Sequence, residues 1–151
     1  MNGFESDLKR GLCSKGFAAS LIVEVFILFQ AGFDSDLFRM SLPIAAAFPY
    51  AAAWLVEYES GFLKASLPRC GITPYIFGKF FACGICGGLP GTFGCLVYKI
   101  AREEAEEISL ILIFVSGMMW AVFSATLAAW SKSRYIAYGG AFVIYYLLII
   151  L

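Results

Sequence analysis

The sequence predicts an all-α protein, a polytopic bundle of transmembrane helices that forms one domain over residues 1-151. Of its 151 residues, 61% are hydrophobic and 15% are charged, whereas soluble domains contain about 45–50% apolar and about 25% charged residues. The apolar residues gather into five stretches, and the basic residues concentrate in alternate segments between them. Both patterns are typical of a chain that crosses a lipid bilayer several times.

Each apolar stretch approaches the length of about 20 residues that a helix needs to cross the hydrocarbon core of a membrane. The last stretch is the shortest, since the chain ends within it. The simplest interpretation is a chain cut inside or just after its fifth helix, with a sixth helix missing. The five predicted spans cover approximately residues 17-33, 40-56, 74-98, 108-130 and 136-151.

The positions of lysine and arginine predict the orientation, because cytoplasmic loops of membrane proteins carry an excess of both. With a cytoplasmic N-terminus, eight basic residues fall in inner segments and three in outer loops. We therefore expect a multi-pass protein of the plasma membrane with its N-terminus inside. The inner residues are Lys9, Arg10, Lys15, Lys64, Arg69, Lys79, Lys132 and Arg134, and the outer ones are Arg39, Lys99 and Arg102.

A polar segment over residues 57-73 joins the second and third predicted spans on the cytoplasmic side. Ser60 is of a type that caps helix N-termini, and Pro68 is of a type that ends helices, so a short amphipathic helix can form between them. One interpretation is an ordinary polar loop between two helices. The other is a docking segment for a cytoplasmic partner protein.

The third predicted span is rich in glycine and contains a proline. Gly84 and Gly88, like Gly87 and Gly91, are spaced four residues apart, which allows the backbones of neighbouring helices to approach closely. Pro90 removes one backbone hydrogen bond and is expected to bend the helix. The pattern is compatible with close helix packing and also with a hinge used during transport.

Glu24 is the one acidic residue deep inside a predicted span. A carboxylate within a membrane is costly and often marks a functional site, so Glu24 is a candidate for a transport path. The alternative is a neutral side chain, or one paired with a hydroxyl on another helix, such as that of Ser116, Ser124 or Thr126.

Several kinds of chemistry are not supported by the sequence. The chain contains no histidine, and the C-x-x-C pair Cys83 and Cys86 has no second pair to complete a zinc site. It lacks both the G-x-x-x-x-G-K-[ST] phosphate loop and the usual hydrolase motifs. Its net charge is zero, which gives no basic surface for nucleic acid. We expect no catalytic centre, metal or cofactor.

One long stretch, "AAAFPYAAAWLVEYESGFLKASLPRCGITPYIFGKFFACGICGGLPG", resembles the second and third spans of ABC transporter permeases of the type-2 exporter class, especially small bacterial ones. The likeness extends more weakly over the fourth span and "SKSRYIAYGGAFVIYY". The matching positions are the Phe-Pro-Tyr-Ala run at 48-51, Glu57, Glu59, Ser60, Gly61, Arg69, Tyr75, Lys79, Gly87 and Gly88.

The resemblance implies a half-transporter with six helices that pairs with a second permease chain and with two ATP-hydrolysing subunits. In such permeases a cytoplasmic helix between the second and third spans rests in a groove of the ATPase, and export is the usual direction. Two alternatives stay open: an ATPase-independent transporter or channel that uses Glu24, and a membrane scaffold or inactive fragment. The partner-coupling residues implied by the resemblance are Glu57, Glu59, Ser60, Gly61, Phe62, Arg69, Tyr75 and Lys79.

Overall fold

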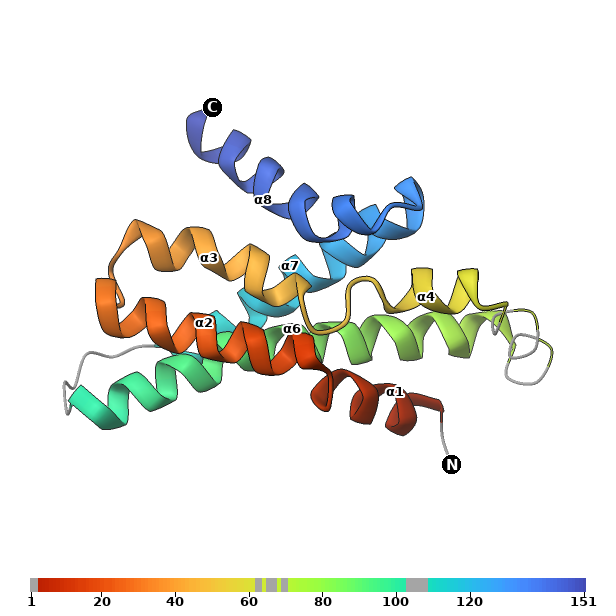
Figure 1. Ribbon diagram of the computed structural model, residues 1–151, viewed down its shortest axis with the longest axis horizontal. Coiled ribbons are helices and arrows are strands. Elements are labelled where there is room, and N and C mark those ends of the chain that lie inside the picture. Colours follow the sequence, from red (N-terminus) through yellow and green to blue (C-terminus); the bar gives the residue numbers. More distant parts are fainter. Residues whose placement is uncertain (1–2, 62–63, 65–67, 69–70, 103–108) are drawn as a thin grey trace.

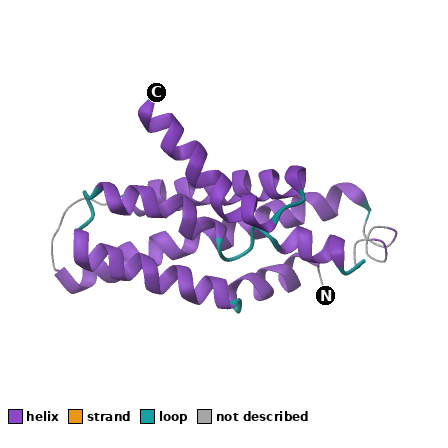
Figure 2. Cartoon of the chain, turned by 45° about the horizontal axis from the view of Figure 1, so that its top comes forward, coloured by secondary structure: helices purple, strands orange, loops and turns teal. Residues whose placement is uncertain are grey.

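The computed structural model describes residues 3–61, 64, 68, 71–102 and 109–151, and all regular secondary structure within these residues is helical (Figures 1 and 2). The all-α class predicted from the sequence is therefore confirmed. The helices are α1 (Gly3–Leu12), α2 (Lys15–Ala31), α3 (Asp36–Ala47), α4 (Ala53–Glu59), α6 (Ile72–Arg102), α7 (Leu110–Ser131) and α8 (Arg134–Ile150).

The antiparallel pair α6 and α7 forms the centre of the bundle, and the glycines of α6 lie in their contact. A Cβ atom added at Gly87 would lie 2.2 Å from the Cβ of Ala121, and one at Gly88 would lie 2.8 Å from the backbone oxygen of Phe114. Helix α6 continues through Pro90 without interruption. The predicted small-residue spacing therefore brings the two helices together.

The N-terminal helices pack against this pair, and serine caps define where they begin. The hydroxyl of Ser14 accepts a hydrogen bond from the backbone N–H of Phe17 at 3.0 Å, and Ser35 accepts one from Phe38 at 3.2 Å. Such caps satisfy backbone donors that have no partner inside the helix. Helix α2 contacts α6 and α3, while α1 is bent by 51° from α2 and also packs on α6.

Two of the described helices, α6 and α7, are long and apolar enough to cross a membrane, and the bent pair α1–α2 makes a third if it is one broken span. Along α6, no charged residue lies between Lys79 and Lys99. At 1.5 Å per residue this run is about 28 Å long, close to the hydrocarbon core of about 30 Å. The structure thus fits a membrane protein.

Five separate spans are more than these helices support. The predicted span 40-56 is interrupted at residues 48–52, because Pro49 has no N–H to continue the hydrogen-bonding pattern of α3. At 12 residues, α3 is about 18 Å long. Helix α8 has 17 residues, fewer than the roughly 20 of a full crossing. The orientation of the N-terminus stays a prediction.

Cysteine labelling tests that orientation. Cys13 is exposed, whereas Cys83, Cys86 and Cys95 are buried. In a Cys70→Ser variant we expect a membrane-impermeant maleimide to label Cys13 in inside-out vesicles and not in intact cells. A Cys13→Ser, Cys70→Ser double variant is the unlabelled control. Labelling of Cys13 in intact cells would reverse the predicted orientation.

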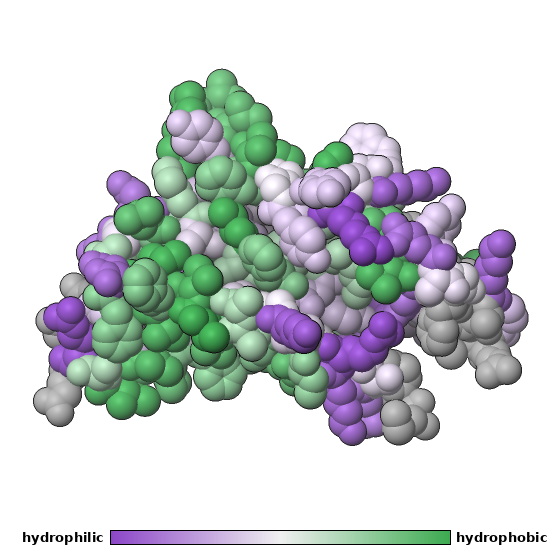
Figure 3. All heavy atoms as spheres, viewed as in Figure 1, coloured by the Kyte–Doolittle hydropathy of each residue, from purple (hydrophilic) through white to green (hydrophobic). Residues whose placement is uncertain are grey.

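Polar and apolar side chains separate along the molecule. Figure 3 shows apolar side chains over much of the region formed by α2, α3 and the outer part of α8. Hydrophilic side chains concentrate at the end that contains α1, α4 and the start of α6, with a smaller group at the opposite end. The candidate site lies at the end that contains α1 and α4.

Candidate functional site

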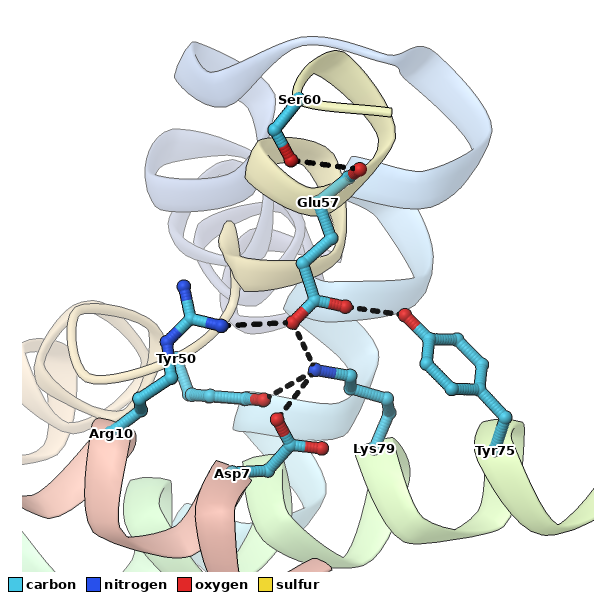
Figure 4. Close-up of polar contacts among 7 residues, drawn as sticks. All are labelled: Asp7, Arg10, Tyr50, Glu57, Ser60, Tyr75 and Lys79. Atoms are coloured by element: carbon cyan, nitrogen blue, oxygen red, sulfur yellow. Dashed lines mark hydrogen bonds and ion pairs between the residues drawn. The ribbon is translucent and has the colours of Figure 1, made fainter. Parts of the chain in front are cut away.

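A cluster of two acidic and two basic side chains joins three helices at this end of the bundle (Figure 4). Asp7 and Arg10 come from α1, Glu57 from α4 and Lys79 from α6. We call these four residues the charged cluster. Their formal charges cancel, so the cluster brings opposite charges together without a net charge.

The sequence of α1 places two of its four charged residues, Asp7 and Arg10, toward α4 and α6. Asp7 and Arg10 are three residues apart and therefore lie on one side of the helix. Leu8 and Leu12 of the same helix pack against a hydrophobic core cluster that includes residues of α6. Gly11 permits this close approach, since an added Cβ would lie 2.4 Å from the sulfur of Cys86.

Lys79 is the centre of the charged cluster. Its Nζ lies 2.7 Å from Asp7 Oδ1, 2.5 Å from Glu57 Oε1 and 2.9 Å from the hydroxyl of Tyr50. An ammonium group has three N–H donors, and these three contacts use all of them. The same atom lies 5.4 Å and 5.5 Å from the ring centres of Tyr50 and Tyr75. Lys79 therefore has no donor left for a ligand.

Glu57 is equally well satisfied. Its side chain is 3% exposed and accepts hydrogen bonds from Lys79, from Tyr75 and from Arg10 at 3.2 Å. Ser60 donates its hydroxyl to the backbone oxygen of Glu57 at 3.1 Å, which closes the end of α4 (Figure 4). Because every charge has an opposite partner, the cluster holds α1, α4 and α6 in one arrangement.

The phenol of Tyr50 completes the cluster from the turn between α3 and α4. Its side chain is buried, and its oxygen accepts a hydrogen bond from Lys79. Burial and the two nearby carboxylates, those of Asp7 and Glu57, all disfavour a negative charge on the phenol oxygen. Tyr50 therefore stays neutral and contributes a polar contact without changing the charge balance of the cluster.

A pocket of about 250 Å³ lies beside the charged cluster. Its wall consists of the rings of Tyr50, Tyr75 and Phe80, the Lys79 side chain, and small or aliphatic residues of α6, of α7 and of the turn between α3 and α4. Since the donors of Lys79 are already used, the interior offers mainly apolar and aromatic contacts. It suits an apolar group better than an anion.

The structure separates the predicted partner-coupling residues into two groups. Glu57, Tyr75 and Lys79 lie together in the cluster, with Glu57 and Lys79 buried. Glu59, Ser60 and Gly61 are exposed beyond it, and Glu59 pairs with Arg134 at the start of α8. The predicted Phe62 and Arg69 lie outside the described residues, as does most of the predicted short helix.

Sequence reasoning missed the contribution of α1. Asp7 and Arg10 stand in a short segment before the first apolar stretch, and their three-residue spacing was the only signal available for them. Tyr50 belongs to the Phe-Pro-Tyr-Ala run, yet nothing in that run indicates a partner for Lys79.

The hydroxyl that contacts Glu24 is also different from those predicted. Ser41 of α3 lies 3.3 Å from one carboxylate oxygen of Glu24. Of the predicted partners, Ser124 donates to the backbone of Ala137, and Thr126 donates to that of Phe123. The prediction of a hydroxyl on the fourth span was wrong because the sequence does not show which helices are neighbours. In the structure α2 packs on α3 and α6.

The C-x-x-C pair lies within the bundle. Cys83 and Cys86 are both buried, and the Cys83 thiol lies 3.5 Å from the backbone oxygen of Ala121. Across the described part of the chain, no group of three or more histidine, cysteine, aspartate or glutamate side chains is placed to hold a metal ion.

No protein-family model, curated protein or solved structure matches this chain. The class that the fold itself defines is an α-helical protein with two or three helical segments able to cross a membrane.

Proposed function

We propose that this chain is the membrane-spanning permease subunit of an ATP-driven ABC transporter, an exporter, to which a separate ATPase couples through residues 57-79. The observation that favours this proposal is the charged cluster. Glu57 and Lys79 are the first and last residues of this segment, and the two side chains bind each other and α1. A force applied to the segment therefore acts on α4, α6 and α1 together.

In this proposal the two groups of coupling residues have different tasks. The exposed corner, consisting of Glu59, Ser60, Gly61 and Lys64, is available to the ATPase. Gly61 makes the turn at a φ of +73°, a conformation that other residues adopt with strain. The buried cluster transmits the movement, because opposite charges at such short distances do not separate easily inside a protein.

The proposal also includes the topology of the chain. The N-terminus and the exposed corner lie on the cytoplasmic side of the plasma membrane, as the excess of basic residues predicts. Helix α2, the interrupted pair α3–α4, and α6, α7 and α8 supply the five crossings. A second permease chain completes the transporter, and the ATPase supplies the phosphate loop that the sequence lacks.

Co-purification from detergent extracts tests the coupling surface. We expect an ATPase with a phosphate loop to purify with the chain, and Lys64→Glu to reduce its yield about tenfold. Such a loss corresponds to about 1.4 kcal/mol, because in this proposal Lys64 meets an acidic surface of the ATPase, and like charges facing each other across an interface cost this much or more. Quantitative mass spectrometry of the eluate measures the ATPase.

The matched control is Lys99→Glu, which reverses an exposed charge at the opposite end of α6. It should leave the ATPase yield unchanged, and both variants should unfold at the temperature of the wild type. An equal loss in both variants contradicts a specific surface at the corner. Substrate flux in membranes that contain no associated ATPase would favour the independent transporter.

A further inference from the structure

A second buried acidic side chain lies outside the charged cluster, in the middle of α2. Glu24 is 0% exposed and faces both α3 and α6. A Cβ atom added at Gly94 of α6 would lie 3.4 Å from the Cβ of Glu24. The carboxyl group is therefore enclosed by helices rather than directed toward solvent.

Among the residues that the structure describes, no positive charge compensates this group. No ion pair joins Glu24 to another of the described residues. The titratable group of α6 that lies nearby is the Cys95 thiol, and α3 presents the Ser41 hydroxyl. The charged residues of α3, Asp36 and Arg39, are exposed, and Arg39 pairs with Asp34. On α6, Lys99 and Arg102 are exposed, and Lys79 is bound in the distant charged cluster.

The proton of Ser41 has a better acceptor than Glu24. Its oxygen lies 2.9 Å from the backbone oxygen of Phe38, but 3.3 Å and 3.4 Å from the two oxygens of Glu24. A hydroxyl has a single proton, so donation to Phe38 leaves only lone pairs directed at Glu24. An ionised carboxylate also offers only lone pairs. A protonated Glu24 can instead donate to Ser41, and both groups are then satisfied.

The energetics favour the same state. A buried carboxylate without a cationic partner has a large desolvation penalty, and such groups usually become neutral instead. We infer that Glu24 is a proton-binding site: its carboxyl group holds a proton while α2, α3 and α6 are packed around it. This inference does not depend on the proposed transporter function.

Infrared difference spectroscopy of the full chain in lipid nanodiscs tests the site. The spectrum of wild type minus Glu24→Gln is recorded at about pH 6, where exposed carboxyl groups are already ionised. We expect the C=O stretching band of a protonated carboxylic acid, which shifts to lower wavenumber in D₂O. A difference spectrum that contains only carboxylate bands would overturn the inference.

Two further measurements distinguish a proton held by Glu24 from a proton on another acid and from a bound metal cation. Glu59→Gln replaces an exposed acid and should give no such band. Recording the spectra with choline in place of sodium tests a metal cation, because a band that appears only without sodium would assign the site to sodium and overturn the inference. If Glu24→Gln fails to fold, the spectrum of wild type minus Ser41→Ala is recorded instead. Loss of the hydrogen-bond acceptor should move the Glu24 band to higher wavenumber. A difference spectrum without a carboxylic acid band contradicts the site.

Discussion

Replacing Lys79 with methionine is expected to lower the free energy of unfolding by about 3–5 kcal/mol, the usual effect of removing one partner from a buried ion pair. Methionine keeps much of the length of the side chain but removes the ammonium group that binds Asp7 and Glu57. Glu57 is 3% exposed, so water cannot replace the lost partner. Denaturant unfolding in detergent, followed by tryptophan fluorescence, measures the change.

A matched variant and a multiple variant identify the cause. Lys99→Met removes an exposed lysine from the other end of the same helix and should change stability by less than about 0.5 kcal/mol. Adding Asp7→Asn to Lys79→Met removes the one uncompensated charge, because Glu57 keeps Arg10 as a partner, and should restore much of the loss. Equal effects of Lys79→Met and Lys99→Met would show that Lys79 has no special role in stability.

The substitution Gly87→Ala is expected to destabilise the bundle by about 1–3 kcal/mol, the typical effect of overpacking a core. The new methyl group would lie 2.2 Å from the Cβ of Ala121 and 2.7 Å from the backbone oxygen of Ala46. Neither atom belongs to a flexible side chain, so α6 must move away from its neighbours. The same unfolding measurement detects the loss.

Gly78→Ala is the control, because it makes the same change on the same helix where no atom lies within 4 Å of the new methyl group. Alanine is favoured over glycine inside helices by up to about 1 kcal/mol, so this variant should be neutral or more stable. Gly87→Ala should therefore lower stability, whereas Gly78→Ala should not. A loss of stability at both positions would mean that the contact at Gly87 is not the cause.

The sequence alone was sufficient for the helical class and for the two long apolar helices. The uncharged run between Lys79 and Lys99 is visible as consecutive letters, and so is the four-residue spacing of Gly87 and Gly91. Both features are local, because hydrophobicity and helical spacing depend on residues close together in the chain. Pro49 was also visible, but a high apolar content over 40-56 outweighed it in the prediction.

The partners of the buried charges depended on the tertiary structure. Lys79 binds a carboxylate 72 residues away in the chain, and Arg10 binds one 47 residues away. Glu24 likewise meets the hydroxyl of Ser41 instead of one on the fourth span. Composition shows which charges a chain carries, but their pairing depends on where helices cross, and that is set by close packing of many side chains from distant segments.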